Sequence, residues 1–434
     1  MKINKLSLYF FLCLATFSTT LLAQENTKEG FSFGLVPVVA YDSDIGFKYG
    51  GLTNLYWYGD GSTYPKYRHS LYLEWSRTTK GSGINQIIYD TEFLIPNVRM
   101  TLETSLFTEK AVDFYGFNGY EAWYNPEFEN QESADYLSRL YYRHERKLAR
   151  VRMDFQGKIS DLPLRWYAGI DYYGNKVSDL DYNKLNADLD EEDKLPIDTS
   201  LFYNFVKWGA IADNEKDGGN ITYLKLGLVY DTRDNEPNPN SGIWTELLLL
   251  AAPKLSKDGF SYSRIAFTHR QYITLVPKRL TFAYRASYQG LITGNMPFFM
   301  LPFVYNTNIT RDGLGGAKTI RGVLRNRIVG NDFAYSNIEL RWKFLKKVIF
   351  RQNFYISLNT FFDAGMVTRN YEYNTALIPQ NYFAATKSET LHLGYGLGVR
   401  LALNDNFVVA VDYGMAAKEE DGDSGVYIGM NFLF

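Results

Sequence analysis

Alternation of apolar and polar residues over stretches of about ten residues constrains the fold of this chain more than any other feature. In Leu391–Leu403, every second residue starting from Leu391 is large and apolar, and the residues between them are polar or small. The same period of two recurs in Phe407–Met415 and Ser336–Phe344. Because successive side chains of a β-strand point to opposite faces, each stretch predicts a strand with one apolar and one polar face.

The class of protein follows from what accompanies this alternation. After residue 23 no apolar run approaches the length of a membrane-spanning helix. Aromatic residues make up 17% of the chain, an excess that suits the two interfacial girdles of a membrane barrel. The polar faces mix charge with glycine, as a crowded, wet lumen requires. We therefore predict an all-β fold, a transmembrane antiparallel β-barrel, which lipid requires to be closed.

A strand count by eye gives 16 or 17, and we take 16. The stretch 31–40 reads either as the first strand or as a lead-in, while 136–146 and 147–159 read as two strands. This count puts the long connection 109–135 at the periplasmic end, where turns of such barrels are short. A strand between 31 and 160 is therefore split or missed.

The first 23 residues predict a secretory signal peptide, because Lys2 and Lys5 precede an apolar run that ends in Leu-Leu-Ala. The single cysteine, Cys13, lies in this segment, so we expect no disulfide in the mature chain. Residues 24–434 are then one barrel domain in the outer membrane of a Gram-negative bacterium. A net charge of −2 gives no basic footprint for nucleic acid.

Four segments in the second half of the chain carry a family resemblance. They are Gly227-Leu-Val-Tyr-Asp-Thr-Arg-Asp-Asn235, Leu314-Gly-Gly-Ala-Lys-Thr-Ile-Arg-Gly322, Phe361-Phe-Asp-Ala-Gly365 and Gly394-Tyr-Gly-Leu-Gly-Val-Arg400. In this order they resemble the BamA/TamA-like superfamily of outer-membrane assembly and translocation barrels, also called the bacterial surface antigen family. The resemblance implies help with insertion or translocation of proteins, or of lipids.

The same resemblance implies that the Arg-Gly loop folds back into the lumen. Arg321 would pair there with Asp363 on the inner wall, and alternation along the strand agrees that Asp363 faces inward. The loop glycines Gly315, Gly316 and Gly322 would let the backbone turn tightly against the wall. Such a pair is structural or conformational; the alternative is a solvated loop arginine.

Two further groups come from the ends of predicted strands. Asp231, Arg233 and Asp234 follow an apolar strand, and they predict an ion pair that locks the strand end or, alternatively, a contact with a client protein. The last strand is predicted over 423–434. Its residues Tyr427, Gly429, Phe432 and Phe434 resemble the C-terminal signal that outer-membrane barrels present to their assembly machinery.

We expect neither an enzyme nor a cofactor or metal site. The chain has four histidines, and an inward-facing His392 is explained as a polar lumen residue. The acidic group Glu419, Glu420, Asp421 and Asp423 could bind a cation but is more simply a solvated loop. Assembly members of the family carry periplasmic POTRA domains, each of about the size of a small soluble domain. We expect none here, since too few residues precede the first convincing strand.

Three hypotheses of function follow. The first is an outer-membrane barrel that assists insertion or translocation, with membrane lipid, nascent outer-membrane proteins and a separate periplasmic protein as partners. The second is a passive pore or structural barrel that kept the fold without the activity. The third is a surface enzyme or adhesin that uses the connections 109–135 and 174–220, where the aromatic stretch 115–124 could bind a glycan.

Overall fold

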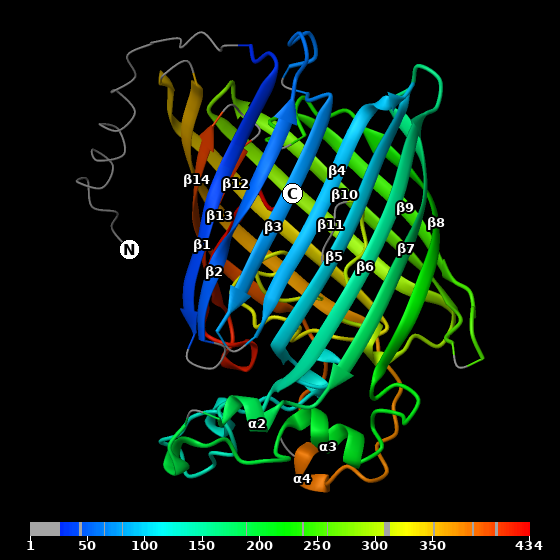
Figure 1. The fold of residues 1–434 in the computed structure, drawn as a ribbon, viewed down its shortest axis with the longest axis vertical. Helices are drawn as coiled ribbons and strands as arrows, with labels where there is room; N and C mark the ends of the chain where they lie inside the picture. The colour runs from blue at the N-terminus through cyan, green and yellow to red at the C-terminus, as the bar shows by residue number, and fades with distance from the viewer. Residues whose placement is uncertain are drawn as a thin grey trace, which may run out of the picture.

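The computed structural model describes residues 27–434 apart from 43–45, 65, 80, 188, 237, 258, 308–312, 350–351, 384–385 and 404–406. The expected signal peptide, 1–23, lies outside the described residues. In the part that is described, sixteen antiparallel strands form one sheet in which each strand pairs with its neighbours in the sequence. The sheet is rolled into a barrel (Figure 1), so the predicted all-β fold with 16 strands is confirmed.

The strands have these bounds: β1 Phe31–Asp42, β2 Gly46–Trp57, β3 His69–Thr78, β4 Gly83–Ile95, β5 Val98–Asp113, β6 Arg143–Lys158, β7 Leu164–Ser178, β8 Gly218–Asp231, β9 Gly242–Ala252, β10 Tyr262–Val276, β11 Leu280–Gly294, β12 Asp332–Ile349, β13 Gln352–Arg369, β14 His392–Leu403, β15 Phe407–Ala416 and β16 Ser424–Met430. Short α-helices lie in the connections: α2 Tyr182–Leu185, α3 Leu201–Lys207 and α4 Gln380–Phe383. Single 3₁₀ turns are η1 Gly119–Glu121, η2 Pro126–Phe128, η3 Glu191–Asp193, η4 Phe298–Met300 and η5 Glu419–Asp421. Among the described residues no helix has the length and apolar character to cross a membrane.

The structure settles the alternative left open for the first strand and corrects one other part of the predicted strand count. Residues 31–42 are a full strand, β1, rather than a lead-in. The stretches predicted as two strands, 136–146 and 147–159, are one strand, β6, preceded by an irregular segment. With β1 counted, the long connection between β5 and β6 lies at the same end as the other long connections. The conflict in the sequence-based count is thereby removed.

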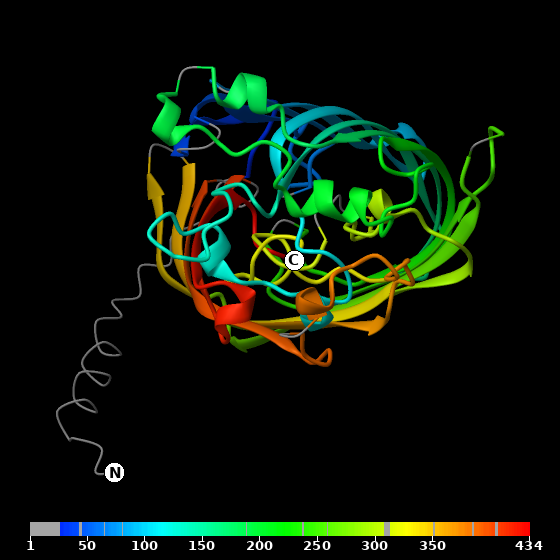
Figure 2. The same ribbon diagram turned by 90° about the horizontal axis from the view of Figure 1, so that it is seen from below.

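The long connections gather at one end of the barrel (Figure 1) and fold over its mouth (Figure 2). They are residues 114–142, 179–217, 295–331 and 370–391. Each of them contributes aromatic or aliphatic side chains to one large buried cluster, in which Phe114, Phe205 and Phe298 are nearly inaccessible. Because a cluster of this kind excludes water, the connections form a packed cap at this end.

The two faces of the sheet differ as the alternation predicts. On the outer face Leu224, Leu226 and Leu228 are 50%, 63% and 46% exposed. Inside, Arg341 and Arg400 are buried. An apolar exterior around a charged interior is the reverse of a soluble protein and suits a surface solvated by lipid.

Candidate functional site

The connection between β11 and β12 enters the lumen and turns there on glycine. Gly315, Gly316 and Gly322 have φ of 101°, 79° and 95°, a region that residues with a Cβ rarely adopt. An isolated bridge between Leu314 and Ile328 holds the two ends of this inner loop together. Residues 313–328, called the lumen loop below, therefore form a closed hairpin-like turn inside the barrel.

Arg321 lies at the tip of the lumen loop against β13. Its Nε donates to Asp363 Oδ2 at 2.8 Å and its Nη2 to Asp363 Oδ1 at 3.0 Å. The backbone N–H of Arg321 also donates to Asp363 Oδ2, at 3.0 Å. The guanidinium lies 3.5 Å from the centre of the Phe361 ring. The structure thus places the two residues that the resemblance pairs in a bidentate, fully buried ion pair.

Two further carboxylates on the wall complete the site, and the sequence prediction missed their part in it. Arg321 Nη1 donates to Glu339 Oε1 on β12 at 2.8 Å and to Asp412 Oδ2 on β15 at 3.3 Å. Each of these carboxylates has a second cation: Arg341 donates to Glu339 at 2.8 Å and Arg400 to Asp412 at 2.7 Å. Alternation places the two carboxylates and their two wall arginines on inward faces. Only the register between strands brings these four side chains together.

The wall opposite Arg321 is built from glycine. A Cβ on Gly394 of β14 would overlap the carbonyl oxygen of Arg321, and one on Gly414 of β15 would lie 2.8 Å from its carbonyl carbon. The glycine-rich segment 394–400 therefore has a local reason. Its missing side chains leave the groove in which the backbone of the lumen loop lies.

The lumen loop is also tied to the last strand. The N–H of Gly322 donates to the Tyr427 hydroxyl of β16 at 3.0 Å. A Cβ on Gly429 would find only the end of Lys318 nearby, at 3.9 Å. The inner face of β16 is therefore in direct contact with the loop that carries Arg321.

The C-terminal residues leave the sheet, contrary to the predicted strand 423–434. The strand β16 ends at Met430, and Asn431 turns the chain with φ of 66°. Phe432 and Phe434 are then buried in the lumen, where the Arg341 guanidinium lies 4.5 Å and 4.9 Å from their ring centres. Arg341 also donates to the backbone oxygen of Phe434, at 2.9 Å. The terminal aromatic residues thus pack on inner cations rather than facing lipid, and their role as an assembly signal stays a prediction.

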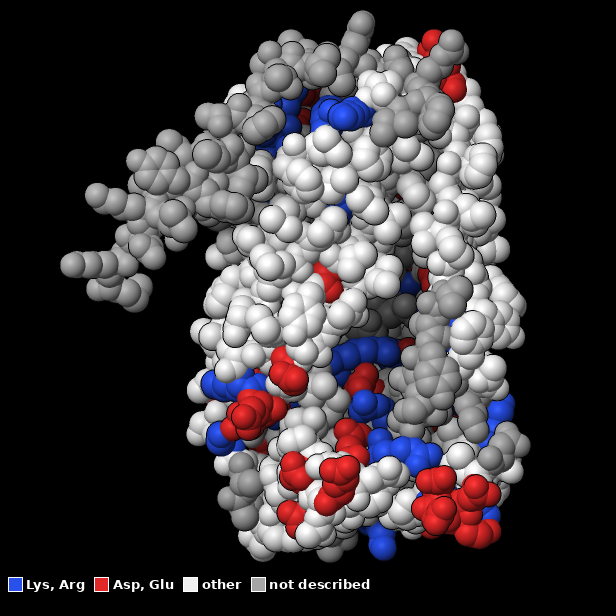
Figure 3. All heavy atoms as spheres, turned by 90° about the vertical axis from the view of Figure 1, so that its left-hand side faces the viewer, with Lys and Arg blue, Asp and Glu red and all other residues white. Residues whose placement is uncertain are grey.

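The first and last strands meet without a hydrogen-bonded ladder. The pairs of the described residues run from β1–β2 to β15–β16 and do not include β1 with β16. Where β16 has ended, β1 approaches the next strand, β15, since a Cβ on Gly34 of β1 would overlap the Phe407 ring of β15. Figure 3 shows the side where β1 lies, and its surface is hollowed near the middle, with Lys and Arg atoms visible inside. We call the junction of β1 with β15 and β16 the seam.

Asp231, Arg233 and Asp234 lock the connection between β8 and β9. Arg233 Nε donates to Asp231 Oδ1 at 3.0 Å, and its guanidinium lies 3.9 Å from the Trp244 ring centre. The carboxylate of Asp234 accepts from the N–H of Asn240 at 2.8 Å. Both contacts are local, which favours the strand-end lock among the two alternatives.

The acidic group before β16 is not simply solvated, because Asp421 is buried. Its Oδ1 contacts His392 Nδ1 at 2.5 Å, and its Oδ2 accepts from the Tyr120 hydroxyl at 2.5 Å. The ring of Tyr120 stacks on that of His392 with 3.8 Å between centres. This cluster joins the β5–β6 and β15–β16 connections across the cap. Among the described residues no group of three or more His, Cys, Asp or Glu side chains is placed to hold a metal ion.

Comparisons with known proteins agree with the fold. A family model described as the Omp85 superfamily domain matches residues 76–434. The crystal structure of BamA from Haemophilus ducreyi lacking POTRA domains 1–3 is similar, with TM-score 0.50 and 14% identity over 93% of this chain and 70% of that one. CdiB from Escherichia coli is similar with TM-score 0.52 and 10% identity, over 93% of this chain and 62% of that one. At such identity these two structures support the fold alone. No curated protein matches the chain.

Proposed function

Because this chain belongs to the Omp85 superfamily, we propose that it assists the insertion or translocation of proteins, or of lipids, at the outer membrane. Its partners are then membrane lipid, nascent outer-membrane proteins and a separate periplasmic protein. The Arg321 network serves this function by holding the lumen loop in place rather than by catalysis.

The seam is the observation that carries this proposal. The strand β1 has 12 residues and β16 only seven, and no ladder joins the two in the described part of the chain. Backbone N–H and C=O groups that face lipid without partners cost several kcal/mol each. A free edge of this kind is stabilised by pairing with another strand, and an incoming client strand supplies one.

The lumen loop adds a second reason for placing the activity at the seam. Through Gly322 it contacts Tyr427 on β16, and through Arg321 it is fixed to β12, β13 and β15. Any outward movement of β16 must therefore break or drag contacts of the loop. The position of the lumen loop is thus linked to whether the seam is open or closed.

A disulfide across the seam tests the proposal. Gly34 and Phe407 are suitable positions, because the side chain of one would occupy the space of the other. The only native cysteine, Cys13, lies in the expected signal peptide. We expect the Gly34→Cys/Phe407→Cys barrel in proteoliposomes to accelerate folding of a client outer-membrane protein when reduced and to lose this effect when oxidised.

Each single-cysteine variant under the same oxidant is the matched control, and an unrelated porin of similar size gives the background rate. Client folding that continues at full rate after complete oxidation would exclude opening of the seam. No acceleration over the porin by the wild-type barrel would favour a passive pore or structural barrel instead.

A further inference from the structure

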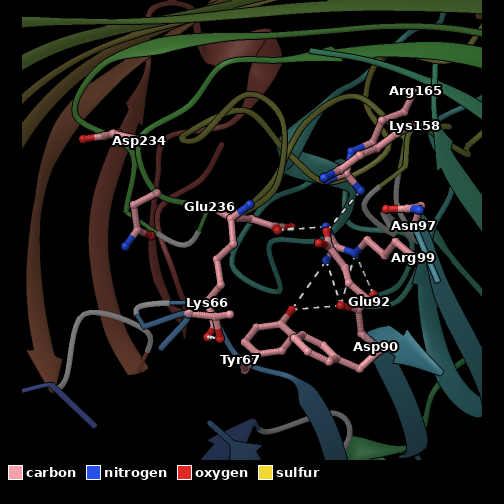
Figure 4. A pocket seen from close by; sticks show the side chains of 13 residues that line it. Lys66, Tyr67, Asp90, Glu92, Asn97, Arg99, Lys158, Arg165, Asp234 and Glu236 are labelled. Atoms are coloured by element: carbon pink, nitrogen blue, oxygen red, sulfur yellow. Dashed lines mark hydrogen bonds and ion pairs between the residues drawn. The ribbon is translucent and has the colours of Figure 1, made fainter. Parts of the chain in front are cut away.

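A polar cavity opens at the end of the barrel opposite the cap and takes no part in the function proposed above. Its volume is about 200 Å³. It is lined by the ends of β4 to β7 and by the connections β2–β3 and β8–β9 (Figure 4). Since it lies at the short-turn end, it faces the periplasm in the membrane orientation expected for such barrels.

The carboxylates of this cavity already have partners. Asp90 accepts from Arg99 Nε at 2.9 Å and from the Tyr67 hydroxyl at 3.0 Å. Glu236 accepts from Arg99 Nη1 at 2.8 Å, and Glu92 from Arg165 at 3.0 Å. The fourth carboxylate is that of Asp234, which is held by backbone N–H groups of its own turn.

The lysines of the cavity do not have such partners. Within the described residues neither Lys66 nor Lys158 has a hydrogen bond or ion pair from its ammonium group, and both side chains line the cavity. Figure 4 shows Lys158 and Arg165 side by side with their nitrogen atoms on the same side, and Lys66 reaching in from the β2–β3 connection. Both lysines are exposed, and together with Arg99 and Arg165 they balance the four carboxylates of the lining. Their ammonium groups are therefore the cations that the described lining leaves without a carboxylate partner.

The arginines beside the cavity are already engaged with carboxylates of the neighbouring turn. Burial by itself raises the pKa of the Glu236 carboxyl, but the positive charges of Arg99 and Arg233 outweigh burial and lower that pKa to about 2. These guanidiniums are already paired, Arg99 with Asp90 and Glu236 and Arg233 with Asp231. They do not supply charge for a further anion, which leaves that part to Lys66 and Lys158.

The rim of the cavity is apolar on the side of the membrane. Phe93, which lines the cavity, is 46% exposed, and its neighbours Leu94 and Ile95 are exposed as well. The level of these side chains at the end of β4 is where a barrel meets the headgroups of the periplasmic leaflet. A lipid phosphate at this level lies within reach of the cavity mouth.

We propose that this cavity binds a phosphate group, with Lys66, Lys158 and Arg165 as its ligands. Lysine binds phosphate as a compact point charge and arginine through paired donors, so the set matches the chemistry of this anion. The phosphate is carried either by a lipid headgroup or by a small soluble molecule. This site does not depend on insertion activity and would exist equally in a passive barrel.

Titration calorimetry of the detergent-solubilised barrel with inorganic phosphate tests the site. Replacing both lysines, Lys66→Ala/Lys158→Ala, should weaken phosphate binding about tenfold or more, because two charge-assisted contacts are lost. The control Lys147→Ala/Lys254→Ala removes the same charge from exposed positions near the capped end and should bind like wild type. An equal loss of phosphate binding in both double variants would show that binding depends only on the overall charge of the barrel, and it would overturn the site.

A variant that is expected to tighten phosphate binding, rather than weaken it, keeps the test independent of any folding defect. Glu92→Gln removes the carboxylate that pairs with Arg165 and should tighten phosphate binding severalfold, since the guanidinium becomes available. Unchanged or weaker binding in Glu92→Gln, or no phosphate binding by wild type, would contradict the proposal.

Competition then identifies the source of the phosphate. Short-chain phosphatidic acid and glycerol 3-phosphate present the same monoester with and without acyl chains. Tighter binding of the lipid, lost in Lys66→Ala/Lys158→Ala, assigns a lipid headgroup. Equal binding of the two assigns a soluble phosphate.

Discussion

Arg321 shows at the scale of one side chain how a membrane barrel keeps a buried cation. Three carboxylates, from Asp363, Glu339 and Asp412, and the ring of Phe361 surround a guanidinium that has no exposed surface. Removing such a charge from water costs several kcal/mol, and only good geometry offsets that cost. The arrangement is therefore sensitive to either partner, because a truncation leaves buried charge without compensation.

We expect Arg321→Ala to lower the free energy of unfolding by about 3–5 kcal/mol, the usual cost of breaking a buried ion pair. Urea unfolding of the barrel in detergent measures this. The control is Arg68→Ala, because Arg68 pairs with Asp60 at the surface with side chains 31% and 67% exposed. Surface pairs contribute about 0–1 kcal/mol. Equal losses in the two variants would contradict a special role for the lumen pair.

At the scale of elements, the β8–β9 connection is held at both ends and in its middle. Arg233 and Asp234 fix its base, while Glu236 reaches across the barrel mouth to Arg99 on β5. The connection therefore joins strands that are not neighbours in the sheet. Its charged contact with β5 should also carry a dependence on pH.

The Glu236 contact should stabilise the barrel above pH 4.5 and weaken as the pH falls toward 2. The pKa of Glu236 is lowered from 4.5 to about 2 in the folded chain. A lowered pKa means that the unfolded chain takes up the proton first, so the stabilisation is lost on acidification. The measurement is the difference in unfolding free energy between wild type and Glu236→Gln from pH 7 to pH 2. A difference that stays constant below pH 4 would contradict it.

The whole molecule is a barrel filled from within and capped at one end. The lumen loop, the C-terminal residues and the buried arginines of the wall occupy its interior, while the long connections pack over one mouth. From this filling by the described residues we expect no wide path for water and ions along the barrel axis. The two ends of the lumen loop are bridged at Leu314 and Ile328. The loop between them can therefore be shortened without stretching the rest of the chain.

We expect wild-type barrel in a planar bilayer to conduct far less than an unrelated porin of similar size. Replacing residues 316–326 with a short glycine linker should raise the conductance severalfold, and Arg321→Ala should raise it less, since the loop is then loosened but present. Wild-type conductance equal to that of the porin would show that the lumen is open.

Residues on one strand could be assigned from the sequence, but residues on different strands could not be brought together. Alternation alone puts Asp363, Glu339 and Asp412 on inward faces, and the resemblance pairs only the first with Arg321. The register that brings Glu339 opposite Phe361 and Asp412 opposite Gly398 depends on turns and bulges along the whole sheet. A slip of one residue would turn each side chain outward, so the pattern fixes the face but not the partner.

The sequence by itself determined the all-β class, the two faces of each strand and the family, because these depend on side-chain period and short motifs. Only the tertiary structure decided that β1 is a strand, that β16 stops at Met430 and that the last phenylalanines turn inward. It also decided that Lys66 and Lys158, far apart in the chain, line one cavity. These features arise from contacts between residues far apart in the chain, and such contacts leave no local pattern in the sequence.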